Sequence, residues 1–568
     1  MSINNRPYTF GVLSQGFSET VISALSKEWM KSLLVFAFFF LTFSFVYLPL
    51  TVLSSSDDHF FHFRFAQVMR ERGFFEAFNN FTNLHFSKIT EGVYYPYYNF
   101  LFYLFIIPFT YINPLYLGIK VYAVCAVASF FTTLYAIARQ FNVPHAFGWV
   151  VALFSLAGTD SILRLLSSRP YVLAPVLLIL LIFFLYRRQY LLAGGISFLY
   201  LFWHSATFFM PLIVASTYYV FEYLYTKRRD TRNVISVLIG TGLALLCVSL
   251  IVPGYFTYLH EIIFTNVFNL RVDTFLPEGG ELYVTDILGY IRQNSVLFSA
   301  LIIAFCTELY TYFQFKRGNT SQHEDPFARV RASVFFLSIA FFAGAALVTG
   351  RFVDYLLPFF GLYLILALAR FKTKVIVVED GLKRYVAVGV FVALIYLWGT
   401  TGITLNTALA SGGAPPEVFE GVGTWLRTRT TRGEVVFNPT WNWFPQLYYY
   451  SPNTDYIVGL EPRFLYAYNP RLFWLWVHIS YDGYVCETKE CRELSVARNA
   501  ALNHPNEASA WYATQGDAIA RVLSSDFKSA YIVSSFEFTA LNAVLDNNEH
   551  FEKMYGASRT YYIYRLIP

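Results

Sequence analysis

Residues 32–53 read SLLVFAFFFLTFSFVYLPLTVL and contain no Asp, Glu, Lys or Arg. About 20 apolar residues cross a lipid bilayer as a helix, so this stretch predicts a membrane span. Four further stretches without these charged residues cover 189–221, 233–260, 332–350 and 385–416. The sequence therefore predicts a protein that crosses the membrane several times.

The composition of the 568-residue chain agrees with this prediction. Hydrophobic residues make up 56% of the chain and charged residues only 14%, whereas soluble domains contain about 25% charged residues. These values exclude an ordinary soluble enzyme, a coiled coil and a disordered chain. The first apolar run is not followed by a small-residue cleavage site, so we expect no cleavable signal peptide.

The balance of charge divides the chain in two. Residues 406–568 carry 13 Lys and Arg against 16 Asp and Glu, whereas residues 1–405 carry 29 against 21. Residues 411–416, SGGAPP, are typical of a linker. We predict a transmembrane module over residues 1–410 and a soluble domain over residues 411–568, which has an ordinary domain size.

Clusters of Lys and Arg predict the topology, because cytoplasmic loops of membrane proteins are enriched in both. If every cluster is cytoplasmic, the chain crosses an even number of times between Lys31 and Arg139. We therefore interpret the short aromatic stretch 97–112 as an interfacial or re-entrant helix. Eleven spans remain, at about 32–53, 117–138, 145–158, 170–186, 190–204, 206–225, 234–252, 295–314, 332–350, 355–370 and 385–405.

This arrangement predicts a multi-pass protein of the plasma (inner) membrane. The N-terminus is expected in the cytoplasm and the C-terminal domain outside it, with counts of 11 to 13 spans left open. A first outer loop would cover residues 54–116 and a large outer loop residues 253–294. Ionisable residues gather at this outer face, where such groups are costly and often functional.

The first outer loop holds the pattern DDHFFHFRFAQVMRERG at residues 57–73. We expect a helix from about His59, ended by Gly73. Asp58 is either the residue that caps this helix or a general base for an acceptor hydroxyl or amine. Asp57 is the second candidate base, and His59, His62 and Arg64 are candidate supporting residues.

The segment DHFFHFR, residues 58–64, resembles the first-loop motif of oligosaccharyltransferase catalytic subunits, in which an Asp-Pro pair precedes aromatic residues and an arginine. These enzymes belong to the GT-C glycosyltransferases, which use polyprenyl-phosphate-linked sugar donors. A Tyr-Pro pair follows in that family, as does Tyr95-Pro96 here. The segment GRFVDYLLP, residues 350–358, is similar to the family's late motif, whose arginine holds the donor phosphate.

The resemblance implies a polytopic all-α membrane module of the GT-C type with a C-terminal extracytoplasmic α/β domain. It assigns donor phosphate binding to Arg351. From their own positions near the outer face, His204 could hydrogen-bond the phosphate and Arg169 could be a second, bidentate contact. Alternatives remain open for each residue. Arg351 could anchor a helix at the interface or pair with Asp354, His204 could be a satisfied histidine between helices, and Arg169 an ordinary interfacial arginine.

Two departures from the family pattern bear on the reaction. The second outer loop retains one acid, Asp160, where the family has a metal-binding acidic pair, so the need for Mg²⁺ or Mn²⁺ is open. The Trp-Trp-Asp motif is missing, and its nearest counterpart is TWNWF at residues 440–444. Glu278 and Glu281 of the large outer loop could form a lid, complete a cation site with Asp58, or be plain solvated residues.

The C-terminal domain is predicted to be α/β. Strands are expected at 434–437, 455–458, 530–533 and 560–564, with a helix at 508–524. Cys486 and Cys491 bracket a short loop, so they are a candidate disulfide pair if this domain is external; two free thiols are the alternative.

We therefore predict an integral-membrane inverting glycosyltransferase. It would move a sugar or glycan from a polyprenyl-phosphate or polyprenyl-diphosphate donor to an extracytoplasmic acceptor of unknown kind. The alternatives are an N- or O-linked protein oligosaccharyltransferase and a transporter or flippase for lipid-linked sugars. No nucleotide-binding loop is present, and the basic clusters are topology signals rather than a nucleic-acid site.

Overall fold

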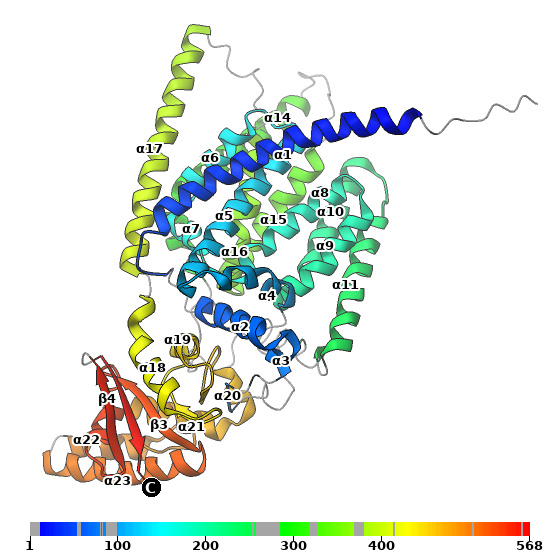
Figure 1. Ribbon diagram of the computed structural model, residues 1–568. Coiled ribbons are helices and arrows are strands. Elements are labelled where there is room, and N and C mark those ends of the chain that lie inside the picture. Colours follow the sequence, from blue (N-terminus) through cyan, green and yellow to red (C-terminus); the bar gives the residue numbers. More distant parts are fainter. Residues whose placement is uncertain are drawn as a thin grey trace, which may run out of the picture.

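The structure is a computed structural model that describes residues 12–53, 58–79, 81, 83–86, 99–252, 255–256, 259, 285–316, 327–368, 380–412, 415–502, 505–557 and 560–567. Figure 1 shows a bundle of helices with a smaller sheet-containing region at one end of it. This architecture confirms the predicted fold class, a membrane module of helices followed by a C-terminal α/β region.

A helix coincides with each of the eleven predicted spans, because each apolar run buries one face against its neighbours and can leave the other in lipid. These helices are α1 (Val12–Tyr47), α5 (Leu115–Gln140), α6 (Ala146–Leu156), α8 (Ala174–Tyr186), α9 (Tyr190–Trp203), α10 (Met210–Thr226), α11 (Arg232–Ile251), α14 (Ser295–Lys316), α15 (Ala328–Leu347), α16 (Val353–Leu368) and α17 (Asp380–Gly412).

Fewer of these helices are long enough to cross a bilayer alone. In the described part of the chain, six segments are long and apolar enough, or eight if each of two bent pairs counts as one span. One bent pair is α6 with α7 (Thr159–Leu165), at 109°, and the other is α13 (Ile287–Gln293) with α14, at 89°. The predicted span at 145–158 coincides with α6, which is long and apolar enough only together with α7 across this bend. The total of eleven to thirteen crossings stays a prediction.

The predicted even number of crossings between Lys31 and Arg139 is supported by contacts at one end of the bundle. Arg139 Nη2 lies 2.9 Å from Glu28 Oε1, so the start of the first span and the end of α5 meet. Between them, α1 and α5 supply two crossings. Residues Phe100–Tyr111 form α4 (Phe100–Ile106) and the 3-10 turn η1 (Ile107–Tyr111), an apolar element shorter than a span.

Close packing of small residues joins α9 to α11. A Cβ atom on Gly240 would overlap the carbonyl oxygen of Gly194, and the hydroxyl oxygens of Ser197 and Thr241 lie 2.6 Å apart. Small residues let helix backbones approach in a membrane, where apolar burial by itself gives little preference between helix and lipid. This pairing fixes the end of α9, which leads into the site described below.

The first outer segment folds as predicted. Helix α2 (Asp58–Arg72) ends at Gly73, whose φ of +97° is in the left-handed region that glycine adopts without strain. The short helix α3 (Phe74–Asn79) follows. Figure 1 shows α2 between the bundle and the sheet-containing region. The predicted Tyr95-Pro96 pair lies outside the described residues.

The C-terminal region contains a five-stranded mixed sheet in the order β2-β1-β3-β5-β4. The strands are β1 (Val435–Phe437), β2 (Asp455–Tyr456), β3 (Ser529–Ser535), β4 (Phe551–Ala557) and β5 (Tyr561–Leu566). The helices around it are α18 (Glu420–Arg429), α19 (Phe444–Tyr450), α20 (Arg463–Tyr468), α21 (Pro470–Val477), α22 (Arg492–Leu502), α23 (Pro505–Ser525) and α24 (Thr539–Asp546). The predicted strands and helix all appear.

Two details of this region differ from the sequence prediction. Strand β4 was not predicted, because it is a sheet edge with exposed Glu552 and Lys553 that interrupt the apolar pattern. Helix α17 continues to Gly412, so the predicted linker begins inside a helix.

The chain that follows α3 is attached to the edge of the sheet at β2. The backbone N–H of His85 donates to the Tyr456 carbonyl at 3.1 Å, and Leu84 forms a parallel bridge with Tyr456 of β2. The ring of Phe61 on α2 packs against Tyr448 of α19, with centroids 5.4 Å apart. These contacts hold α2 and the segment after it against the C-terminal region.

Candidate functional site

Helix α2 brings Asp58 to Arg169. The carboxylate Oδ2 of Asp58 lies 2.8 Å from Nη2 of Arg169, which precedes the 3-10 turn η2 (Pro170–Val172). The two side chains are only 21% and 15% exposed, so water screens this ion pair less than a surface pair. Helix α2 begins at Asp58, and the role of Asp58 as a cap stays a prediction. Asp57 lies outside the described residues.

The ion pair continues into a larger group of charges. Tyr171 lies between two guanidinium groups, with the Cζ atoms of Arg169 and Arg164 at 5.8 and 5.6 Å from its ring centroid. Arg164 Nη2 lies 2.6 Å from Oδ1 of Asp354 at the start of α16. Asp354, the expected alternative partner of Arg351, thus binds Arg164. We call Asp58, Arg164, Arg169, Tyr171 and Asp354 the ion-pair cluster.

A small pocket, part of it open to solvent, lies beside the Arg164–Asp354 pair. Its lining combines the polar side chains of that pair with two hydroxyl groups and apolar surface. The remaining lining residues are Ser161, Leu165, Tyr171, Val172, Val353, Leu357 and Pro358.

A second polar group, the histidine cluster, consists of Tyr200, His204, Thr207 and Tyr355. His204 Nδ1 lies 2.6 Å from the Thr207 hydroxyl oxygen. Tyr355 donates to the same oxygen at 3.0 Å, and the Tyr200 and Tyr355 hydroxyl oxygens are 3.1 Å apart. Asp354 and Tyr355 are neighbours in the chain, so one turn of α16 contributes to both clusters.

Another hydrogen bond ties the two clusters together. Trp203 Nε1, next to His204, donates to the carbonyl oxygen of Pro170, next to Arg169, at 2.7 Å. The loop after α9 and the loop before α8 therefore have a fixed relation. The predicted donor-binding residues His204 and Arg169 come from these two loops.

Arg351 lies in the 3-10 turn η6 (Gly350–Phe352) at the start of the late motif. Within the described residues, its guanidinium makes no hydrogen bond or ion pair. The assignment of the donor phosphate to Arg351 stays a prediction.

The predicted supporting residues of α2 have different surroundings. His59 and His62 are buried, and burial, with the charge of Arg169, lowers the pKa of His59 to about 3. His62 Nδ1 lies 3.0 Å from the Tyr103 hydroxyl oxygen on α4. His62 thus joins α2 to α4, whereas both ring nitrogens of His59 are buried without a hydrogen-bond partner among the described residues.

Arg64 contributes to a different contact. It donates to Gln67 Oε1 at 2.7 Å. Burial lowers the pKa of the Arg64 guanidinium, whereas the nearby hydroxyl groups of Tyr448 and Tyr449 on α19 raise it. At 100° per residue it lies on another side of α2 from Asp58. Arg64 therefore joins α2 to the C-terminal region and is not brought to the ion-pair cluster.

The expected cation site is not formed by the described residues. Asp160 is exposed in the first turn of α7, and Glu278 and Glu281 lie outside the described residues. The Asp58 carboxylate already binds Arg169. A role for Mg²⁺ or Mn²⁺ stays a prediction, and no step below is routed through a metal.

Sequence reasoning missed several residues of the site. Arg164 lies in the apolar stretch ILRLL, where a charge at membrane depth is itself a functional signal. Tyr171, Tyr200, Thr207 and Tyr355 carry no comparable signal, because aromatic and hydroxyl residues are abundant throughout this chain. Only their contacts single them out.

The structure also shows where two sequence features of the C-terminal region lie. Trp443, in the counterpart of the Trp-Trp-Asp motif, packs against Phe419, Phe538 and Tyr561, so it belongs to the core of this region. Cys486 and Cys491 are joined by a disulfide.

Solved structures with the same arrangement of helices and sheet are GT-C membrane glycosyltransferases. The apo oligosaccharyltransferase of Archaeoglobus fulgidus is 13% identical, covers 94% of this chain and 74% of its own, and has a TM-score of 0.53. ArnT from Cupriavidus metallidurans, bound to undecaprenyl phosphate, is 10% identical, covers 95% of this chain and 98% of its own, and has a TM-score of 0.53.

The likeness at these identities shows the fold. The chain is a multi-pass membrane protein with the GT-C fold, and the similarity extends over about 95% of its length. A second structure of the A. fulgidus enzyme, with zinc and sulfate, is 14% identical over 94% of this chain and 74% of its own, with a TM-score of 0.51. No protein-family model and no curated protein matches the sequence.

Proposed function

We propose that this protein is an inverting glycosyltransferase that moves a sugar or glycan from a polyprenyl-phosphate or polyprenyl-diphosphate donor to an extracytoplasmic acceptor. One observation carries the proposal: a GT-C fold brings the first-loop acid Asp58 within 2.8 Å of Arg169 and links that pair to the late motif through Arg164 and Asp354.

The donor phosphate would lie at Arg351. A guanidinium offers several N–H groups in a fixed plane and suits a phosphate. His204, in the loop after α9, would add a hydrogen bond to the phosphate. ArnT, which shares the fold, is solved with undecaprenyl phosphate. The polyprenyl chain would extend from this point along the lipid-facing helices.

The acceptor would lie at Asp58. In the proposed step the carboxylate takes the proton from an acceptor hydroxyl or amine. The acceptor atom forms a bond to the anomeric carbon, and the bond from that carbon to the donor phosphate oxygen breaks with its electron pair on the oxygen. Attack from the side opposite to the phosphate inverts the anomeric configuration. Arg169 would hold Asp58 ionised and stabilise the phosphate charge that develops.

Two alternatives have less support. A protein oligosaccharyltransferase would need a counterpart for the missing Trp-Trp-Asp motif, and Trp443 is packed in the core instead. An acceptor peptide with Asn-x-Ser/Thr would distinguish this activity. A transporter or flippase would be expected to carry its polar residues near the membrane midplane between repeats, and we find no repeat in the sequence.

Binding of undecaprenyl phosphate to the purified full-length protein tests the donor site. Loss of one charge-assisted phosphate contact costs about 1.5–3 kcal/mol, or about 10- to 150-fold in affinity. We expect Arg351→Gln to bind the lipid phosphate at least tenfold more weakly than the unaltered protein. Arg187→Gln is the matched control, because Arg187 is an exposed arginine at the other end of the bundle. Equal binding by Arg351→Gln and the unaltered protein would contradict the assignment.

A further inference from the structure

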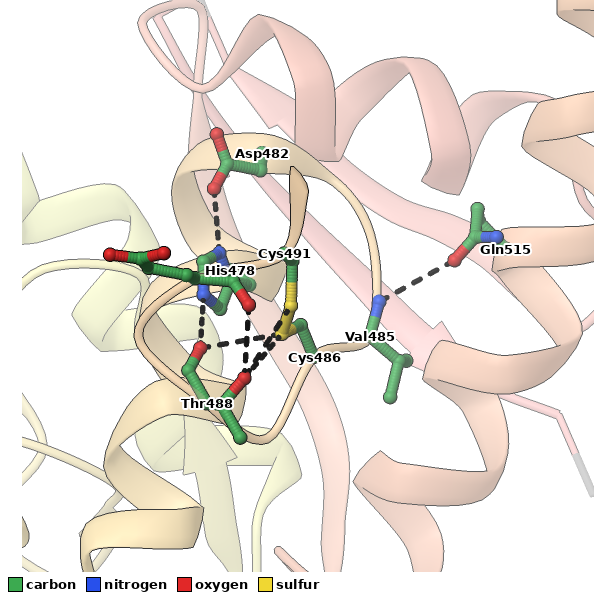
Figure 2. Close-up of a disulfide and its surroundings, with 8 residues drawn as sticks. His478, Asp482, Val485, Cys486, Thr488, Cys491 and Gln515 are labelled. Carbon is green, nitrogen blue, oxygen red and sulfur yellow. Dashed lines mark hydrogen bonds and ion pairs between the residues drawn. A yellow bond between two sulfur atoms is a disulfide. The ribbon is translucent and has the colours of Figure 1, made fainter. Parts of the chain in front are cut away.

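A buried histidine lies beside the two cysteines of the C-terminal region (Figure 2). His478 begins a π-helical turn, η9 (His478–Asp482), a rare conformation that is often found at functional sites. Its Nδ1 lies 2.8 Å from Oδ2 of Asp482, and its Nε2 lies 2.9 Å from the carbonyl oxygen of Thr488. The ring stacks on Tyr484 at 5.3 Å between centroids, which fixes its orientation.

Both nitrogens of His478 therefore face acceptors. A neutral imidazole has one N–H and can donate to only one of them. If Nδ1 donates to the carboxylate of Asp482, as histidine ligands commonly do in metal sites, Nε2 turns its lone pair toward the Thr488 carbonyl. A cation bound to both atoms would satisfy the Nε2 lone pair and the Thr488 carbonyl oxygen together.

The sulfur atoms of Cys486 and Cys491 lie close to the His478 ring. Cys486 Sγ is 3.3 Å from the Thr488 carbonyl oxygen, and ligand atoms of His478, Cys486 and Cys491 all lie within 4.8 Å of one another. In the described part of the chain this is the single group of three such ligands. Cys486 and His478 are buried, Cys491 is half-buried and Thr488 is exposed, so the site lies at the edge of the core of this region.

We propose that the reduced pair Cys486 and Cys491, together with His478 Nε2 and the Thr488 carbonyl oxygen, binds a zinc ion. Two thiolates and an imidazole are typical zinc ligands. The disulfide seen in the structure is then the oxidised form of the same site. A thiol reductant supplies two electrons and two protons to open the disulfide, and zinc displaces the two thiol protons as it binds.

The geometry suits a tetrahedral ion with little movement. Zinc–sulfur bonds of about 2.3 Å and zinc–nitrogen bonds of about 2.0 Å place two thiolates about 3.8 Å apart and a sulfur and nitrogen about 3.6 Å apart. Both separations fall inside the 4.8 Å span of the three side chains. The Cα atoms of the cysteines are 6.5 Å apart, so rotation of their side chains opens the space. With four protein ligands the ion would hold the 485–491 loop to η9.

Metal analysis of the full-length protein in detergent tests the proposal. The protein is treated with a thiol reductant, incubated with zinc chloride and freed of unbound metal. We expect one zinc per chain after reduction and none in the oxidised protein. Cobalt added in place of zinc should give the absorption of a thiolate-bound tetrahedral ion.

Variants separate this site from adventitious binding. His478→Gln and the double variant Cys486→Ser with Cys491→Ser should take up no zinc, whereas Asp482→Asn should weaken binding about 10- to 100-fold by releasing the histidine ring. His550→Gln, at a half-buried position, and Cys306→Ser, at an exposed one, are matched controls outside the site and should bind normally. The proposal is overturned if the reduced unaltered protein holds no more zinc than the double variant, or if His478→Gln binds as well as the controls.

Discussion

The substitution Asp58→Asn tests the proposed general base most directly. Asparagine keeps the size of the side chain and an oxygen near Arg169, but its amide cannot accept a proton at neutral pH. General base catalysis typically contributes about 10²- to 10⁴-fold in rate. We therefore expect sugar transfer to fall by at least about 100-fold, with the protein still folded and inserted.

The structural cost of the substitution is much smaller. The Asp58–Arg169 pair spans 2.8 Å and its side chains are 21% and 15% exposed. A charge-assisted hydrogen bond of this kind contributes about 1.5–3 kcal/mol. A loss of that size lowers the melting temperature of a chain this long by only a few degrees. A 100-fold loss of transfer well below the melting temperature therefore cannot be a stability effect.

The assay follows radiolabelled sugar from undecaprenyl-phosphate-linked donors into a lipid-free or acceptor fraction, using purified protein in lipid nanodiscs. Glu71→Gln is the matched control, because Glu71 is an exposed acid on the same helix that binds Gln67. Arg169→Gln should reduce transfer while leaving the base in place. The reasoning is refuted if Asp58→Asn retains transfer within threefold of the unaltered protein, or if Glu71→Gln loses as much as Asp58→Asn.

Three further outcomes are expected. Gly73→Ala should lower the unfolding free energy by about 1–2 kcal/mol, because a Cβ is strained at its φ of +97°. Gly148→Ala, in an open helical position, should not lower it. Thermal unfolding in detergent measures both variants. The pKa of His59 is about 3 in the folded protein and 6.5 in the unfolded chain. As the pH falls below 6.5, the unfolded chain therefore binds a proton that the folded protein does not. The free energy of unfolding should then fall by up to about 1.4 kcal/mol per pH unit. His59→Phe should lose less stability between pH 7 and pH 5, and an unchanged pH dependence would contradict this. Asp354→Asn should reduce the rate of sugar transfer, because Arg164 loses its partner. The loss of rate in the double variant with Arg164→Gln should not exceed the combined losses of the two single variants.

The membrane module was largely predictable because a bilayer imposes a requirement along the chain. Each span needs a continuous apolar run, and each basic cluster marks one side, so the eleven helices could be located without any tertiary contact. The end of α2 at Gly73 followed from local backbone chemistry in the same way. Strand β4 was missed because its exposed edge position removes the apolar pattern that marks a buried strand.

The candidate site was predictable only in part. Asp58, Arg169, His204 and Arg351 were named one at a time from residue type and sidedness. Arg64 was placed with them because it follows Asp58 in the motif, yet helical rotation turns it toward Tyr448. Local patterns show which residues are unusual in an apolar setting, but they do not show which way a side chain points.

The sequence by itself determined that the protein crosses the membrane several times and where its helices lie, because apolar burial and charge are properties of short stretches. Only the tertiary structure decided that Asp58 meets Arg169, that Asp354 binds Arg164 and that His478 lies against Cys486 and Cys491. Such contacts join loops far apart in the chain. They depend on how helices pack and bend, which no local period of the sequence encodes.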